Sequence, residues 1–118
     1  MENETVKTAL SYWKAEMAKD LATVLDHFSN DATFEAPGIR LKGREEIQSF
    51  YQGIIGNYAS FNIKAVHQIP CDRNAAIEFH FTYTRMNGES GEAFGCNVFT
   101  VKNRKITRLR AYFNPADY

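Results

Sequence analysis

The last stretch of the chain, residues 93–118, most strongly limits the folds that this sequence can adopt. It holds two runs in which apolar and polar side chains alternate, separated by a short turn with the sequence KNRK. A period of two places successive side chains on opposite faces of a β-strand. The pattern therefore predicts an antiparallel strand pair with Leu109 and Ala111 facing the core. Arg108 and Arg110 face outward, because a slip of one residue would bury them.

One polar residue interrupts the first apolar row of this stretch. Asn97 has the same parity as Ala93, Phe99 and Val101, so alternation places its amide among core side chains. A buried amide in apolar surroundings needs a hydrogen-bond partner, either from the protein or from a ligand. Asn97 is therefore a candidate pocket residue, and a structural amide bonded to backbone is the alternative.

The rest of the chain changes from helical to strand periodicity. Apolar residues at intervals of three and four predict three helices, at residues 3–18, 21–28 and 44–57. A short strand is expected just before Pro37. Beyond Ala59 the pattern alternates, with Asn87-Gly88 as a hairpin turn. Helices followed by long strands predict an α+β fold, in which the helices pack on a strongly curved, mixed and mostly antiparallel sheet to form a cone.

Length, charge and composition exclude several classes of protein. The 118 residues are predicted to form a single domain, 1–118. A net charge of zero argues against binding to nucleic acid or a membrane surface, and no apolar run approaches the ~20 residues of a membrane span. Cys71 and Cys96 lack CxxC spacing, so reduced thiols in a cytoplasmic protein are expected. The histidines fit no metal-ligand spacing, and neither a metal nor a cofactor is expected.

Two stretches of the sequence resemble a known superfamily. The run YWKAEMAKDLATVLDHFSNDATFEAPG, followed by G-REEIQSFY, resembles the opening of nuclear transport factor 2-like proteins, and KITRLRAYFNPADY is similar to their last strand. Within that superfamily the chain resembles the SnoaL-like polyketide cyclases and the ketosteroid isomerases. The resemblance implies a cystatin-like cone and a homodimer through the convex face of the sheet. It does not imply one activity, because this fold hosts many chemistries.

The resemblance to ketosteroid isomerase places three polar side chains around a pocket. The oxyanion tyrosine of that enzyme corresponds to Tyr12, its supporting tyrosine to Tyr51, and the protonated aspartate of its penultimate strand to Asn97. The general base stands just before Pro37 in that enzyme, and this chain has Ala36 there. The resemblance thus implies oxyanion contacts without the usual carboxylate base.

His67 is the candidate replacement for that base. Alternation places it on the same face as Ile63, Ala65 and Ile69, where an imidazole could act as acid or base. A strand bulge would instead turn His67 outward, and a histidine satisfied within the core is the commoner case.

The expected function is binding of a small hydrophobic ligand, polycyclic or terpenoid-like, inside the cone. One hypothesis is an isomerase, cyclase or lyase that stabilises an enolate with Tyr12 and Asn97. The alternatives are a non-catalytic binder and a protein-interaction or dimerisation domain with an incidental pocket. Apolar and aromatic residues are expected to complete the pocket: Trp13, Phe34, Ala36, Phe79, Phe81, Tyr83, Phe99, Leu109, Ala111 and Phe113.

Overall fold

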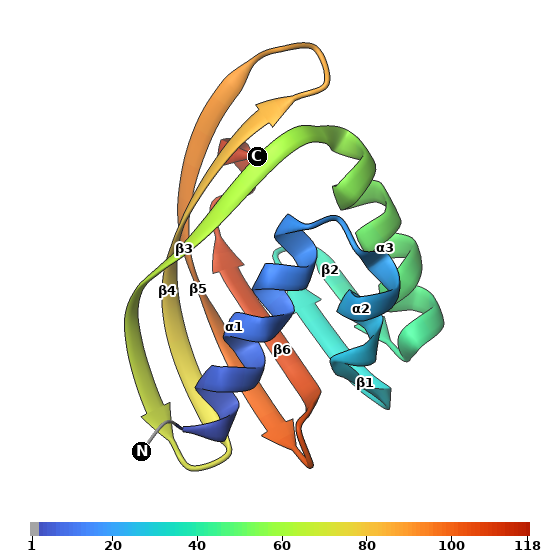
Figure 1. Ribbon diagram of the computed structural model, residues 1–118, viewed down its shortest axis with the longest axis vertical. Helices are drawn as coiled ribbons and strands as arrows, with labels where there is room; N and C mark the ends of the chain where they lie inside the picture. The colour runs from blue at the N-terminus through green and yellow to red at the C-terminus, as the bar shows by residue number, and fades with distance from the viewer. Residues whose placement is uncertain (1–2) are drawn as a thin grey trace.

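The computed structural model describes residues 3–118 and has the predicted α+β architecture (Figure 1). The helices are α1 (Glu4–Met17), α2 (Leu21–Asp26) and α3 (Arg44–Asn57), and a short 3-10 helix, η1 (Pro115–Asp117), follows the last strand. The strands are β1 (Phe28–Ala36), β2 (Ile39–Lys42), β3 (Tyr58–Cys71), β4 (Asn74–Arg85), β5 (Ser90–Lys102) and β6 (Lys105–Phe113).

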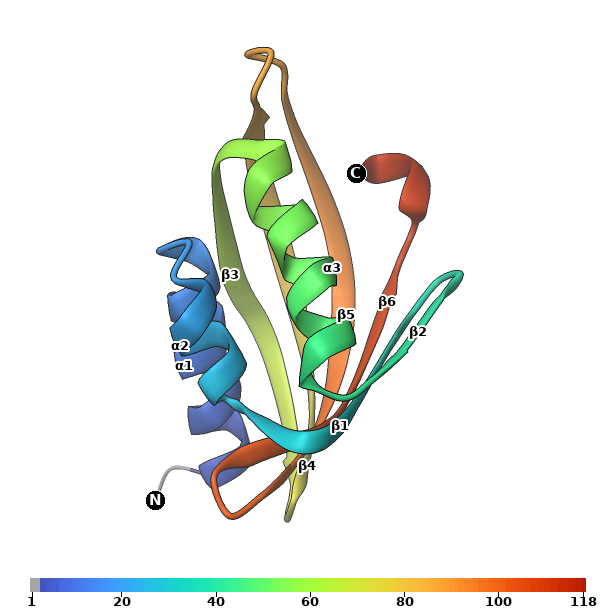
Figure 2. The same ribbon diagram turned by 90° about the vertical axis from the view of Figure 1, so that its right-hand side faces the viewer.

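All six strands form one sheet in the order β2-β1-β6-β5-β4-β3. Every neighbouring pair is antiparallel except β1 and β6, which run parallel. The long strands bend, and the helices lie on the inner, concave side of the bend (Figures 1 and 2). Three helices on the concave face of a bent, mixed sheet are the cone-shaped architecture that the sequence predicts.

The strand pair predicted from the final stretch is present as β5 and β6. Asn97 lies opposite Ala111, and Phe99 lies opposite Leu109. Phe99 and Leu109 are fully buried, whereas about half of the Arg108 side chain is exposed. The alternation therefore assigned the two faces of this pair correctly.

The boundary between α2 and β1 differs from the sequence expectation. Phe28 was expected on the apolar face of the second helix, but it begins β1 and is completely buried. It pairs with Ile106 of β6, and the Ile106 backbone N–H donates to the carbonyl of His27. Helical spacing alone could not reveal this, because the pairing partner lies at the other end of the chain.

A short strand, β2, was not expected. The chain turns at Pro37-Gly38 and comes back, so that Ile39 pairs with Ala36. Gly38 has a φ of 75°, a left-handed conformation that glycine adopts without steric cost. A strand of four residues is too short to show a periodic pattern. For this reason the Pro37-Gly38 turn was predicted to end β1, and β2 was not predicted.

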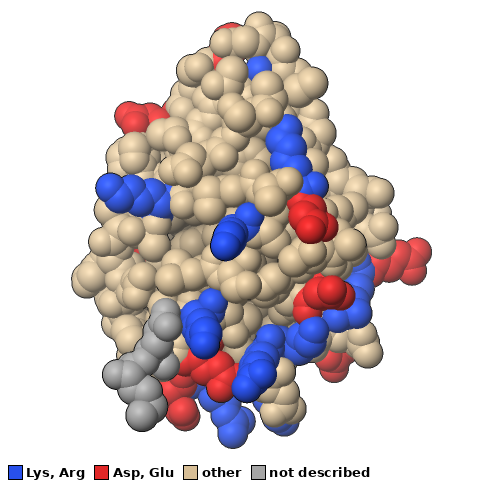
Figure 3. Space-filling model, viewed as in Figure 1, with Lys and Arg blue, Asp and Glu red and all other residues tan. Residues whose placement is uncertain are grey.

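Charges of both signs are distributed over the face of the molecule shown in Figure 3, where Lys and Arg stand among Asp and Glu. This distribution agrees with the net charge of zero. Within residues 3–118, none of the helices combines the length and the apolar character that crossing a membrane requires.

Candidate functional site

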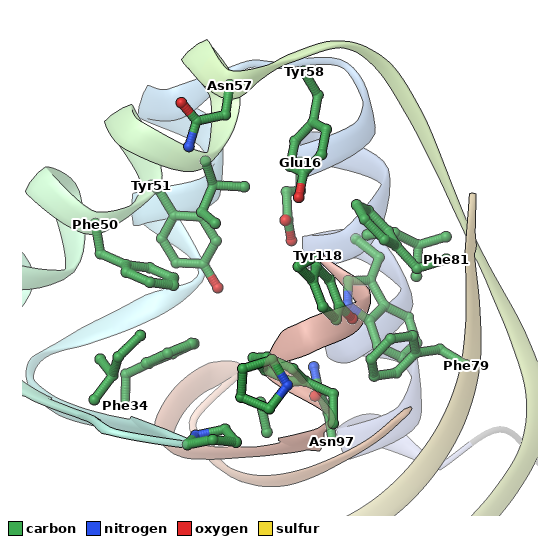
Figure 4. A pocket seen from close by; sticks show the side chains of 18 of the residues that line it. Glu16, Phe34, Phe50, Tyr51, Asn57, Tyr58, Phe79, Phe81, Asn97 and Tyr118 are labelled. Atoms are coloured by element: carbon green, nitrogen blue, oxygen red, sulfur yellow. The ribbon is translucent and has the colours of Figure 1, made fainter. Parts of the chain in front are cut away.

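A cavity of about 370 Å³ lies between the helices and the concave face of the sheet (Figure 4). Its volume falls within the range of about 300–1,000 Å³ that is typical of small-molecule sites. The wall is formed by Tyr12, Trp13, Glu16, Phe34, Pro37, Ile39, Phe50, Tyr51, Ile54, Asn57, Tyr58, Ile63, Phe79, Phe81, Arg85, Asn97, Ala111, Phe113, Pro115 and Tyr118.

Most of the side chains proposed from the sequence lie on this wall. Of that set, the wall includes Tyr12, Trp13, Phe34, Tyr51, Phe79, Phe81, Asn97, Ala111 and Phe113. Phe99 and Leu109 lie behind the wall and are completely buried. Ala36 and Tyr83 are only partly buried and lie outside the lining.

Tyr12 and Tyr51 bring two phenols together at one end of the cavity. Tyr12 comes from α1 and Tyr51 from α3, and their hydroxyl groups are hydrogen-bonded to each other. Burial, followed by the nearby Glu16 carboxylate, raises the pKa of both phenols well above the ordinary value. Both therefore stay protonated. One phenolic proton is used between the two tyrosines, and the Glu16 carboxyl accepts a hydrogen bond from Tyr12.

Asn97 faces the same cavity from β5. The residue is buried, and its Oδ1 is among the side-chain atoms of residues 3–118 that are buried without a hydrogen-bond partner. Leaving a buried acceptor unpaired costs about 1–3 kcal/mol. A ligand or a water molecule that donates to Asn97 would recover that free energy.

Glu16 is a cavity residue that sequence reasoning missed. It lies on α1 four residues after Tyr12, lines the cavity and is only 7% exposed. Burial raises the pKa of its carboxyl to about 7, and the Tyr12 phenol opposes this shift by a smaller amount. The available signal was a charged residue three positions after Trp13, on the buried face of the helix.

Tyrosine side chains share the cavity with Glu16 in Figure 4. The carboxyl and the side chains of Tyr51, Tyr58 and Tyr118 all point into the common space. The Arg85 guanidinium is also part of the wall, but it lies over an aromatic ring, 5.9 Å from the centroid of Tyr58. The cavity thus combines an aromatic lining with one carboxyl group.

The segment after β6 forms one side of the cavity. The Tyr118 ring stacks on Phe81 at a centroid distance of 5.2 Å and contacts Phe113 at 4.5 Å. The Tyr83 hydroxyl donates a hydrogen bond of 2.8 Å to the carbonyl of Asp117. Sequence reasoning missed Tyr118 because an irregular segment carries no periodic pattern.

His67 does not reach the cavity, which corrects its expected inward orientation. The register of β3 against β4 shifts between Ala65 and His67, and such a bulge reverses the parity of the residues beyond it. The His67 side chain is 64% exposed and its Nδ1 lies 2.9 Å from a carboxylate oxygen of Glu78. The alternative orientation, with His67 turned outward by a bulge, is the one observed.

The cone, its curved sheet and its enclosed cavity define the class of nuclear transport factor 2-like domains. Residues 9–109 match the SnoaL-like domain, and the chain belongs to that family. A search of curated proteins found no match.

Solved structures share this fold at low sequence identity. The Rv0760c protein of Mycobacterium tuberculosis, in complex with estradiol-17β-hemisuccinate, superposes with a TM-score of 0.87 at 19% identity, covering 98% of each chain. The Δ5-3-ketosteroid isomerase of a Mycobacterium species gives 0.86 at 19% identity, covering 98% of this chain and 97% of that one. An epoxide hydrolase of M. tuberculosis gives 0.83 at 21% identity, covering 97% and 85%.

Proposed function

We propose that this protein binds a flat, largely apolar small molecule with a hydrogen-bonding oxygen, such as a polycyclic or terpenoid-like compound. The observation that carries this proposal is the Tyr12–Tyr51 pair, two buried phenols that stay protonated, in the wall of an aromatic cavity. The apolar part of the ligand lies between Phe79, Phe81 and the helices. Its oxygen accepts from the tyrosine pair.

Asn97 adds a second polar contact for such a ligand. Its unpaired Oδ1 accepts a hydrogen bond from a hydroxyl group of the ligand or from a bridging water. Two structural neighbours support a polycyclic ligand, since one holds an estradiol derivative and the other is named for a ketosteroid. At 19% identity they show the fold alone, so the proposal rests on the residues of this chain.

Calorimetric titration with estradiol, a flat phenolic steroid, tests the proposal. The wild-type protein is expected to bind one molecule per chain. Tyr51→Phe should weaken binding by roughly 0.5–1.5 kcal/mol, the net contribution of a typical hydrogen bond between neutral groups. Tyr112→Phe is the matched control, because Tyr112 is 53% exposed and lies outside the cavity. Absence of binding, or equal losses in both variants, would contradict the proposal.

A further inference from the structure

The Glu16 carboxyl in the cavity wall has a capacity to accept that the protein does not fill. Its side chain is buried on α1 and accepts a hydrogen bond from Tyr12. A carboxylate offers about four lone-pair sites, so Tyr12 alone does not satisfy it. The ion pairs found among residues 3–118 do not include Glu16. A carboxylate taken out of water is costly to the fold unless a cation compensates its charge.

Two cations near this part of the wall are engaged elsewhere. Arg85 of β4 is the one cation of the described lining, and its guanidinium lies 5.0 Å from the ring centroid of Tyr83 and 5.9 Å from that of Tyr58. Lys19 follows Glu16 by three positions, but its ammonium group donates to two backbone carbonyls at the start of β3. The charge of Glu16 is thus left for a ligand to compensate.

Three rings form a continuous aromatic wall on the Glu16 side of the cavity. The Phe81 ring centroid lies 5.6 Å from that of Tyr58 and 5.2 Å from that of Tyr118. Burial raises the pKa of Tyr118, and the nearby Tyr58 and Glu16 groups raise it further. Figure 4 shows all three rings around the space that Glu16 enters. A ligand group that contacts this aromatic wall therefore lies close to the carboxyl.

Aromatic rings combined with a carboxylate favour a cationic ligand group. The face of an aromatic ring attracts an ammonium group, and such rings are the common recognition element for quaternary ammonium ligands. The Arg85 guanidinium, which lies over the Tyr58 ring, shows that this part of the wall accommodates a cation. A neutral hydroxyl group could donate to Glu16, but it would leave the negative charge uncompensated.

We propose that the ligand of this cavity carries a cationic nitrogen, a protonated amine or a quaternary ammonium group, which binds between the Glu16 carboxylate and the aromatic wall. The inference rests on the proposed ligand site and narrows the class of its ligand. The apolar body of the molecule fills the rest of the cavity, and the cationic group replaces the partner that the protein does not provide.

The affinity for such a cation depends on the ionisation of Glu16. The titratable side chains that face it from its own helix and from the neighbouring elements are phenols whose pKa burial raises: Tyr12, Tyr51, Tyr58 and Tyr118. His27, which meets the Tyr12 ring edge-on, and Asp117 lie outside the lining. Burial raises the pKa of Glu16 to about 7. The carboxylate that attracts the cation therefore forms as the pH rises through this value.

Calorimetric titration of the full chain with the (naphthylmethyl)trimethylammonium ion tests the inference, because this probe keeps its charge at every pH. The wild-type protein should bind it about tenfold or more tightly at pH 8 than at pH 5.5, since the ionised fraction of Glu16 rises by more than that factor. Glu16→Gln should lose most of the affinity at pH 8 and all of the pH dependence. This variant keeps every histidine of the chain, so a flat profile assigns the dependence to Glu16.

A second variant tests the contribution of the aromatic wall. Tyr118→Leu removes a ring without changing a charge and should weaken binding of the ammonium ion about threefold or more. Tyr112→Leu is the matched control and should bind like wild type, because Tyr112 is exposed and lies outside the cavity. Equal affinities in these two variants would show that the cation does not contact the aromatic wall, and would overturn the inference.

Estradiol, which is neutral over this pH range, separates the two proposals. A wild-type protein that binds estradiol but not the ammonium ion, or that binds both without pH dependence, overturns the inference and leaves the ligand site standing. Wild-type affinity for the ammonium ion in Glu16→Gln also overturns it. Binding of the ammonium ion with the expected pH dependence, but not of estradiol, supports the cationic site and contradicts a steroid-like neutral ligand. If the folded wild-type protein binds neither, both proposals fail.

Discussion

The Glu16 carboxyl links the cavity to the stability of the fold. Burial raises its pKa from an ordinary value of 4.5 to about 7 because the charged form is penalised inside the protein. In the unfolded chain the same group titrates near the ordinary value. The folded state therefore binds more protons between these two values, and the free energy of unfolding falls as the pH rises from about 4.5 to about 7.

Replacing Glu16 by glutamine should remove this dependence. Glu16→Gln is expected to be more stable than wild type at pH 8 by roughly 1–3 kcal/mol, since one pKa unit corresponds to about 1.36 kcal/mol. The gain should shrink toward zero near pH 4, where the wild-type carboxyl is neutral in both states. Urea unfolding across this pH range measures the difference. The control is Glu45→Gln, because Glu45 is an exposed carboxyl on α3. A gain that does not change with pH would show that Glu16 is not buried as a titrating group.

Individual site residues were harder to predict than elements, for identifiable reasons. Asn97 was recognisable because an amide interrupts an apolar row, and the row was long enough to establish its parity. The same alternation argument predicted that His67 faces inward. That prediction is wrong because a single bulge reverses the parity of β3 after Ala65. Glu16 could not be predicted from helical periodicity, because apolar residues alone define the buried stripe of an amphipathic helix. A buried carboxyl is not part of such a stripe.

At the scale of elements, the contact between β4 and β5 shapes one wall of the cavity. Gly95 of β5 lies opposite Phe79 of β4, and Phe79 lines the cavity. A Cβ added at Gly95 would lie 2.5 Å from Cζ of Phe79 and 2.7 Å from the backbone oxygen of Tyr112. The ring therefore occupies space that only a glycine leaves free.

Gly95→Ala should destabilise the protein by roughly 1–3 kcal/mol, the usual cost of overpacking. It should also weaken the binding of estradiol, because the Phe79 ring must move. Gly53→Ala is the matched control: Gly53 lies within α3, and a Cβ there has open space around it. That variant is expected to be more stable by up to about 1 kcal/mol, from helix propensity. Thermal unfolding that finds both variants equally stable would contradict this description of the sheet.

The long elements were predictable because each repeats its pattern several times. The alternation of β5 and β6 and the apolar stripe of α1 each extend over many residues and agree with local propensity. β2 has four residues and shows no period. Phe28 fits the end of a helix and the start of a strand equally well. Its pairing with Ile106, which is distant in the sequence, decides between them.

At the scale of the whole molecule, the outer face of the sheet carries exposed aromatic side chains. Phe94 of β5 is 61% exposed and Tyr112 of β6 is 53% exposed. The His80 ring stacks on Phe94 at a centroid distance of 4.4 Å, and His80 Nε2 lies 2.6 Å from a carboxylate oxygen of Glu92. Aromatic residues with a polar surround are typical of protein interfaces. The homodimer expected from the sequence stays a prediction. The exposure of Phe94 leads us to expect this residue in the interface as well.

Sedimentation velocity at micromolar concentration tests the homodimer. The wild-type protein is expected to sediment as a dimer and Phe94→Asp as a monomer, because a charge at a buried interface position is not compensated. Met86→Asp is the control, since Met86 is 69% exposed and lies in the turn between β4 and β5. A monomeric wild-type protein, or a dimer that Phe94→Asp leaves intact, would contradict a dimer through this face.

The central claim, that the interior of the cone is a ligand site, is tested most directly by the Trp13 indole. The chain has one tryptophan, and it lines the cavity in contact with Phe79 at a centroid distance of 5.8 Å. Its indole N–H therefore gives a single, site-specific signal in a ¹H–¹⁵N NMR spectrum. During titration with estradiol this signal should shift and saturate with the affinity found by calorimetry. Saturable binding that leaves the indole signal unmoved would place the ligand elsewhere and contradict the claim.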